Sequence, residues 1–126
     1  MNGKTKILLV DDNAPYLRML SANLKGLGFE VAVTTNPLDA PALAREFQPD
    51  VMLLDVVMPQ QDGGDLYNTL RADPALKNTP ILFTTAANAG PLAKDHPNRF
   101  TFIPKPLKLD VLAVEIQKAT AAARAK

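Results

Sequence analysis

The chain has 126 residues, of which 47% are hydrophobic and 21% charged, a composition typical of one soluble globular domain. Its formal charge of +1 gives no electrostatic basis for direct nucleic-acid binding or for membrane association. With no cysteine and one histidine, His96, the sequence excludes disulfides, thiolate chemistry, histidine triads and multi-histidine metal sites. We predict a single domain over residues 1–126. No apolar run is long enough to span a bilayer, and the N-terminus turns acidic where a signal peptide would still be apolar, so we expect a cytoplasmic protein.

Five short apolar runs alternate with segments of helical periodicity along the chain. In chain order the runs read KILLV, EVAVT, VMLLD, ILFT and FTFI. The first, third and fourth runs are almost continuously aliphatic, which indicates strands buried on both faces, as in a parallel sheet flanked by helices. The sequence therefore predicts a doubly wound α/β fold.

The first helix is predicted between the first two strands. Asn13 is a suitable N-cap, Pro15 is tolerated in the first turn, and Gly28 is a C-terminal stop. Its apolar face is formed by leucines at helical spacing: Leu17, Leu20, Leu24 and Leu27.

Three further segments have helical character. A second helix is expected to begin near Asp39 and end before Pro49, and a third to run from about Asp65 to Arg71. The last helix has one apolar face, formed by Leu109, Leu112, Ala113, Ile116, Ala119 and Ala123. The proline-rich stretch before the fifth strand has room for only a short or irregular helix.

Polar side chains follow the predicted strands where each one ends. Asp11 and Asp12 follow the first strand and Asp55 ends the third, while Thr85 and Lys105 follow the fourth and fifth. The carboxyl ends of parallel strands meet at one edge of a sheet, where such folds bind ligands. We therefore expect three carboxylates, a hydroxyl and an ammonium group to lie together.

Three adjacent carboxylates repel one another, so they either retain protons or bind a cation. Oxygen ligands with no histidine or cysteine nearby favour Mg²⁺. A cation, a carboxylate nucleophile, a lysine and a hydroxyl are the components of phosphoryl transfer to aspartate. The sequence therefore predicts that chemistry at this edge of the sheet.

Four motifs resemble the receiver domain of two-component response regulators. They are ILLVDDN, VMLLDVVMPQQDGG, PILFTTA and FIPKP, and the resemblance covers essentially the whole chain. It implies a five-stranded, flavodoxin-like fold with the strand order 2-1-3-4-5 and helices on both faces. It also implies that Asp55 is the phosphoacceptor and that Asp11 and Asp12 serve Mg²⁺ together with the backbone carbonyl of Val57.

The resemblance assigns two further residues to the phosphoryl group and one to a conformational switch. Thr85 would contact the phosphoryl group and Lys105 would be its counter-charge, while Thr84 competes with Thr85 for the hydroxyl role. Phe102 matches an aromatic that changes rotamer when the threonine moves, although a plain core position remains the alternative.

The implied function is a signalling domain that accepts a phosphoryl group from a histidine kinase or a histidine phosphotransfer protein. It would then present an altered surface to a downstream protein. Such a domain catalyses its own phosphorylation and hydrolysis and is not a turnover enzyme. The alternatives are a phosphorylation-independent adaptor of the same shape and a flavodoxin-like small-molecule module. The second requires a phosphate-binding loop, whereas DDNAP presents negative charge to an anion.

Overall fold

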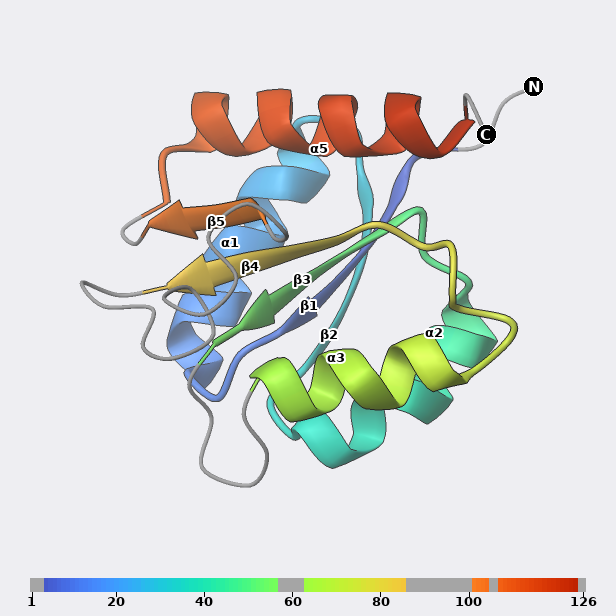
Figure 1. Cartoon of the computed structure of the whole chain (residues 1–126). Coiled ribbons are helices and arrows are strands. Elements are labelled where there is room, and N and C mark those ends of the chain that lie inside the picture. The colour runs from blue at the N-terminus through green and yellow to red at the C-terminus, as the bar shows by residue number, and fades with distance from the viewer. Residues whose placement is uncertain (1–3, 57–62, 86–100, 105–106, 125–126) are drawn as a thin grey trace.

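A computed structural model describes residues 4–56, 63–85, 101–104 and 107–124, with the backbone alone at 63, 64, 85, 101, 102, 104 and 124. The strands form one sheet in the order β2-β1-β3-β4-β5, with every neighbouring pair parallel (Figure 1). They are β1 (Lys6–Val10), β2 (Glu30–Thr34), β3 (Val51–Asp55), β4 (Ile81–Thr85) and β5 (Thr101–Pro104). The helical elements are α1 (Ala14–Gly26), η1 (Pro37–Asp39), α2 (Ala40–Phe47), α3 (Gly63–Ala72) and α5 (Leu109–Arg124).

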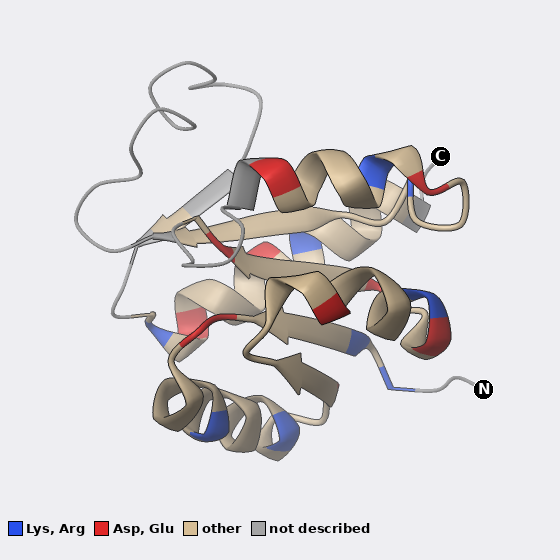
Figure 2. Ribbon diagram, turned by 90° about the horizontal axis from the view of Figure 1, so that it is seen from below, with Lys and Arg blue, Asp and Glu red and all other residues tan. Residues whose placement is uncertain are grey.

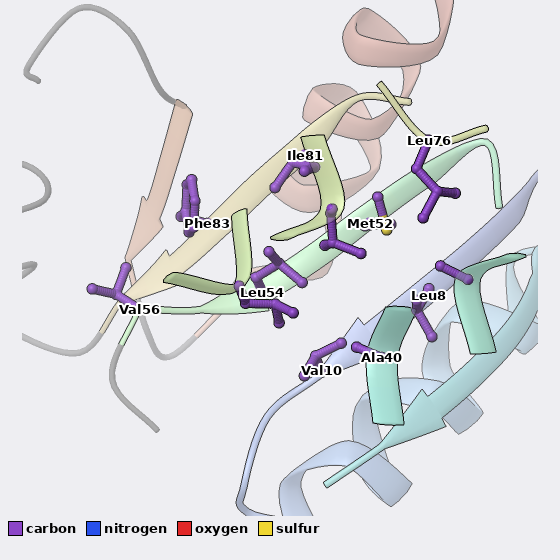
Figure 3. Packing of buried hydrophobic residues seen from close by; sticks show 12 residues of the cluster. Leu8, Val10, Ala40, Met52, Leu54, Val56, Leu76, Ile81 and Phe83 are labelled. Carbon is purple, nitrogen blue, oxygen red and sulfur yellow. The ribbon is translucent and has the colours of Figure 1, made fainter. Parts of the chain in front are cut away.

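Helices cover both faces of the sheet, as the aliphatic strands predict. Helices α1 and α5 lie on one face, and α2 and α3 on the other (Figure 1). Alternate residues of β1 and β3 divide between two apolar clusters, so Leu8 and Leu54 belong to one and Leu9 and Leu53 to the other. Figure 3 shows the cluster under α2 and α3, with Phe83 near the carboxyl end of β4. The predicted α/β fold with a buried parallel sheet is confirmed.

The first helix begins at the predicted cap and stops before the predicted glycine, and only Leu27 departs from its predicted place. The Asn13 side chain accepts a hydrogen bond of 3.0 Å from the backbone N–H of Tyr16, which makes it the N-cap. At the other end Gly28 has a φ of 99°, and the N–H groups of Gly28 and Phe29 donate to the carbonyls of Lys25 and Leu24. This turn directs Leu27 outward, so its predicted place on the apolar face is wrong, because its side chain is 51% exposed.

The other helices agree with the predictions to within about a turn. Helix α2 follows the short η1 helix and stops where Gln48 takes a φ of 55°. Helix α3 begins two residues before the predicted Asp65. Helix α5 buries Leu112 and Ile116 completely. Thr120 is also buried on this helix, and its hydroxyl is satisfied because it donates to the Ile116 carbonyl at 3.0 Å. The segment of the predicted fourth helix lies outside the described residues.

Arg71 organises the connection from α3 to β4. Its guanidinium group donates hydrogen bonds to the backbone carbonyls of Leu76, at 3.0 Å, and Thr79, at 2.6 Å. It also lies over the Tyr67 ring, 5.0 Å from the ring centroid, and that ring contacts Phe83 with its centroid 6.0 Å away. One charged group thus fixes both the turn and the aromatic pair between α3 and β4.

An ion pair links the same connection to α2. Asp73 accepts hydrogen bonds from the backbone N–H of Ala75 at 2.9 Å and from the Arg45 guanidinium at 3.0 Å. The Ala75 N–H, and then Arg45, hold the pKa of the Asp73 carboxyl below its ordinary value. The carboxylate therefore stays charged and keeps the turn closed at neutral pH.

We expect Arg71→Met to lower the free energy of unfolding by about 2 kcal/mol, because two carbonyls lose a charged donor while the apolar stem is kept. Urea denaturation measures this change. Arg18→Met is the matched control, since Arg18 is exposed on α1 and should change stability little. Equal effects of the two substitutions would contradict the assignment.

Candidate functional site

Three carboxylates lie together at the carboxyl edge of the sheet. One oxygen from each of Asp11, Asp12 and Asp55 lies within 4.8 Å of the others. Asp11 and Asp55 are buried, at 3% and 7% exposure, and Asp12 is exposed. Figure 2 shows acidic positions, in red, in the loop that joins β1 to α1 and at the carboxyl end of β3. The predicted convergence of the three carboxylates is therefore observed.

The turn after β1 holds Asp11 in place through the backbone. The N–H of Asp11 donates to the Thr34 carbonyl of β2 at 3.3 Å, which extends the parallel ladder by one residue. An oxygen of the Asp11 carboxylate accepts a hydrogen bond of 3.0 Å from the N–H of Asn13. Asn13 also caps α1, so the start of the helix and the orientation of Asp11 are fixed by the same turn.

Asp55 is positioned by the central strand. It is the last residue of β3 and pairs with Thr84 of β4, and the N–H of Val56 donates to the Thr84 carbonyl at 3.0 Å. Leu54 and Val56 on either side are buried in the cluster under α2 and α3. The Asp55 backbone is therefore held by the sheet and by the core.

The arrangement of these oxygens fits a hard divalent cation. Two unit charges 4 Å apart repel by about 1 kcal/mol in water and by about 4 kcal/mol at an effective dielectric constant of 20. Asp11 and Asp55 are mostly withdrawn from water, so their repulsion energy exceeds the value of about 1 kcal/mol expected in water. Carboxylate oxygens at these separations suit Mg²⁺, which takes one or two carboxylates and keeps several waters. Asp11, Asp12 and Asp55 could hold such an ion between them.

The other predicted site residues are only partly described. Thr85 is the last residue of β4 and pairs with Pro104, and Phe102 lies in β5 opposite Phe83, with the backbone alone described at Thr85 and Phe102. Val57 and Lys105 lie outside the described residues. The backbone therefore brings the ends of β4 and β5 to the edge that carries the carboxylates, and the roles of these four residues stay predictions.

Thr84 occupies a position that sequence reasoning left open. Its side chain is 4% exposed and lines a small cavity together with Asp11 and Tyr16. Sequence reasoning missed the contribution of Tyr16 to this cavity. The available signal was its position four and eight residues before Leu20 and Leu24, which places it on the same face of α1 as these buried leucines.

The chain matches a known protein family over most of its length. Residues 7–117 match the family described as the response regulator receiver domain. The chain belongs to that family. Its sheet order, its acidic cluster and its motifs are thus those of a receiver domain in a two-component response regulator.

Solved receiver structures resemble this receiver domain over nearly its whole length. The chemotaxis protein CheY4 of Vibrio cholerae is 28% identical with a TM-score of 0.83, over 93% of this chain and 99% of that one. The receiver domain of the sensor histidine kinase PA1611 from Pseudomonas aeruginosa is 26% identical, also with a TM-score of 0.83, over 94% and 99% of the two chains. That structure holds a magnesium ion coordinated in its active site cleft.

Curated relatives are longer than this receiver domain. The DNA-binding response regulator MtrA of Mycolicibacterium paratuberculosis is 40% identical over 83 residues, which are 66% of this chain and 36% of that protein. The chain thus spans about a third of the length of that relative. MtrA is named as DNA-binding, so the predicted lack of direct nucleic-acid binding stays a prediction here. Within the part of the chain that the structure describes, no helix is long and apolar enough to cross a membrane.

We expect Asp12→Asn to stabilise the protein in the absence of divalent cations, by about 1 kcal/mol, because it removes one charge from three that repel. Addition of Mg²⁺ should stabilise the wild type and stabilise the variant less, since the ion binds only the folded state. Thermal unfolding with EDTA and with Mg²⁺ measures both effects.

The matched control is Glu30→Gln, which removes one exposed negative charge at the start of β2, outside the cluster. It should leave the Mg²⁺ effect unchanged. A less stable Asp12→Asn variant in EDTA, or one with an undiminished response to Mg²⁺, would contradict this description of the cluster.

Proposed function

We propose that this receiver domain accepts a phosphoryl group on Asp55 from a phosphohistidine donor, in a Mg²⁺-dependent reaction. The observation that carries the proposal is the cluster of Asp11, Asp12 and Asp55 in a chain of the receiver family. Burial of Asp55 at the end of a rigid strand gives its carboxylate a fixed direction of approach, which suits in-line attack.

The reaction forms one bond and breaks one. A carboxylate oxygen of Asp55 donates an electron pair to the phosphorus atom, and the bond between phosphorus and the imidazole nitrogen of the donor breaks. The electron pair of that bond returns to the imidazole, and Asp55 becomes an acyl phosphate. Hydrolysis of the acyl phosphate by water returns the carboxylate and releases inorganic phosphate, so the domain is not a turnover enzyme.

Asp11 and Asp12 supply the remaining carboxylates of the cation site, with the Val57 carbonyl as a further ligand. When bound, Mg²⁺ neutralises charge on the phosphoryl oxygens. The backbone N–H of Asn13 keeps the Asp11 carboxylate turned toward the cluster. A site prepared in this way needs little rearrangement when an anionic donor arrives.

Lys105 and Thr85 complete the proposed site at the ends of the last two strands. The Lys105 ammonium pairs with a phosphoryl oxygen, and the Thr85 hydroxyl donates a hydrogen bond to another. Movement of Thr85 toward the phosphoryl group leaves volume that Phe102 fills, and β5 and α5 then present a different surface to a partner.

A histidine kinase or a histidine phosphotransfer protein is the proposed donor, and the domain acts in the cytoplasm. The adaptor alternative does without Mg²⁺ and phosphate. It provides no use for a cluster of repelling carboxylates, two of which are buried, and this disfavours it.

Incubation with acetyl phosphate, followed by intact-mass measurement, tests the proposal. We expect the wild type to gain one phosphoryl group with Mg²⁺ and none with EDTA. Asp55→Asn should gain none, because the amide cannot attack. Asp39→Asn, an exposed aspartate before α2, is the matched control and should gain the group like the wild type.

Retention of phosphorylation in Asp55→Asn would move the acceptor to another residue. Failure of the folded wild type to gain mass with Mg²⁺ and with any phosphohistidine donor would overturn the function and favour the adaptor.

A further inference from the structure

A small cavity lies between α1 and the carboxyl ends of β1, β3 and β4. Its volume is about 10 Å³, and its lining includes Asp11, Tyr16 and Thr84, with leucines of β1, β3 and α1 around them. A cavity of about 10–15 Å³ holds one water molecule when two or more polar groups line it. This cavity meets the requirement in size and in polar lining.

Thr84 is an unusual residue for its place in the sheet. It lies on the same face as Leu82, two residues earlier in β4, and that face packs in the apolar cluster with Leu53 and Leu9. Valine has the same shape and would fill the position without a polar atom. Thr84 as a whole residue is 4% exposed, and a hydroxyl group in such a setting is stabilised by a hydrogen-bond partner.

The Thr120 hydroxyl, on a similarly buried residue, donates to carbonyls of its own helix, whereas the Thr84 side chain borders the cavity. The Thr84 side chain lines the cavity that Asp11 also lines. A water molecule in that cavity would lie within reach of both the Thr84 hydroxyl and the Asp11 carboxylate.

We propose that one water molecule binds in this cavity, hydrogen-bonded to the Thr84 hydroxyl and donating to the Asp11 carboxylate. Thr84 then acts as a positioning residue for Asp11 from β4, while the N–H of Asn13 holds the same carboxylate from α1. Two supports from different elements fix the carboxylate better than one. The effect on cation binding rests on the proposed function, but the water site itself does not.

This role differs from direct contact with the phosphoryl group. Thr84 lies opposite Asp55 in the β-sheet register, and its side chain lines the small cavity with Leu53 and Leu17. A hydroxyl that acts through Asp11 changes cation affinity. A hydroxyl that contacts the phosphoryl group instead changes the rate of phosphorylation at saturating Mg²⁺ and leaves cation affinity unchanged.

Three variants of the full chain separate these cases. Thr84→Val removes the hydroxyl and keeps the shape, Thr84→Ser keeps the hydroxyl, and Thr120→Val removes a buried hydroxyl elsewhere, on α5. Metal-free crystals of the wild type and of Thr84→Val show whether the cavity holds water. Calorimetric titration with Mg²⁺ gives the dissociation constant of each protein.

We expect electron density for one water within hydrogen-bonding distance of Thr84 Oγ1 and Asp11 in the wild type, and none in Thr84→Val. The Mg²⁺ dissociation constant should rise about 10-fold in Thr84→Val, as for other groups that orient a metal ligand, and return toward the wild-type value in Thr84→Ser. Thr120→Val should bind Mg²⁺ like the wild type.

A dry cavity in wild-type crystals would overturn the water site. Unchanged Mg²⁺ affinity in Thr84→Val would overturn the positioning role even if the water is present. A wild type that binds no Mg²⁺ would refute the proposed function and the positioning role together, while the metal-free crystals still decide the water site.

Discussion

Repulsion among three carboxylates constrains this domain more than any other interaction in it. Asp11 and Asp55 are buried beside the exposed Asp12, an arrangement whose mutual repulsion a bound cation would relieve. A fold tolerates such repulsion only where the surrounding structure holds the groups in place. Here the sheet holds them, because β1 and β3 are parallel neighbours that end at the same edge and are buried on both faces.

The rest of the architecture stabilises that edge. The two apolar clusters, one on each face, hold β1 and β3 rigidly, and the Asn13 cap ties the Asp11 turn to the start of α1. On the far side, Arg71 closes the α3–β4 connection and lies over Tyr67, whose ring contacts Phe83 in the strand next to Asp55. The acidic site is therefore supported from both helical layers.

Local pattern and strand geometry are enough to predict the sheet and the acidic cluster. The aliphatic runs identify a buried parallel sheet, and aspartates at the ends of two such runs identify the cluster without any knowledge of contacts. Leu27 was misplaced because helical spacing does not include the turn at Gly28, which ends α1 and exposes that side chain. The cavity beside Thr84 could not be predicted, since it depends on how side chains of β1, β3, β4 and α1 pack together. The contacts of Arg71 with backbone carbonyls likewise carry no sequence signal.

We propose that Asp11, Asp12 and Asp55 bind one divalent cation. The most direct measurement is anomalous diffraction from crystals containing Mn²⁺, an ion that accepts the same oxygen ligands as Mg²⁺ and is visible by its own scattering. We expect a single anomalous peak between the three carboxylates, lost in Asp12→Asn crystals treated in the same way. The absence of a peak at the cluster in well-ordered wild-type crystals, or a peak only at other acidic side chains, would contradict it.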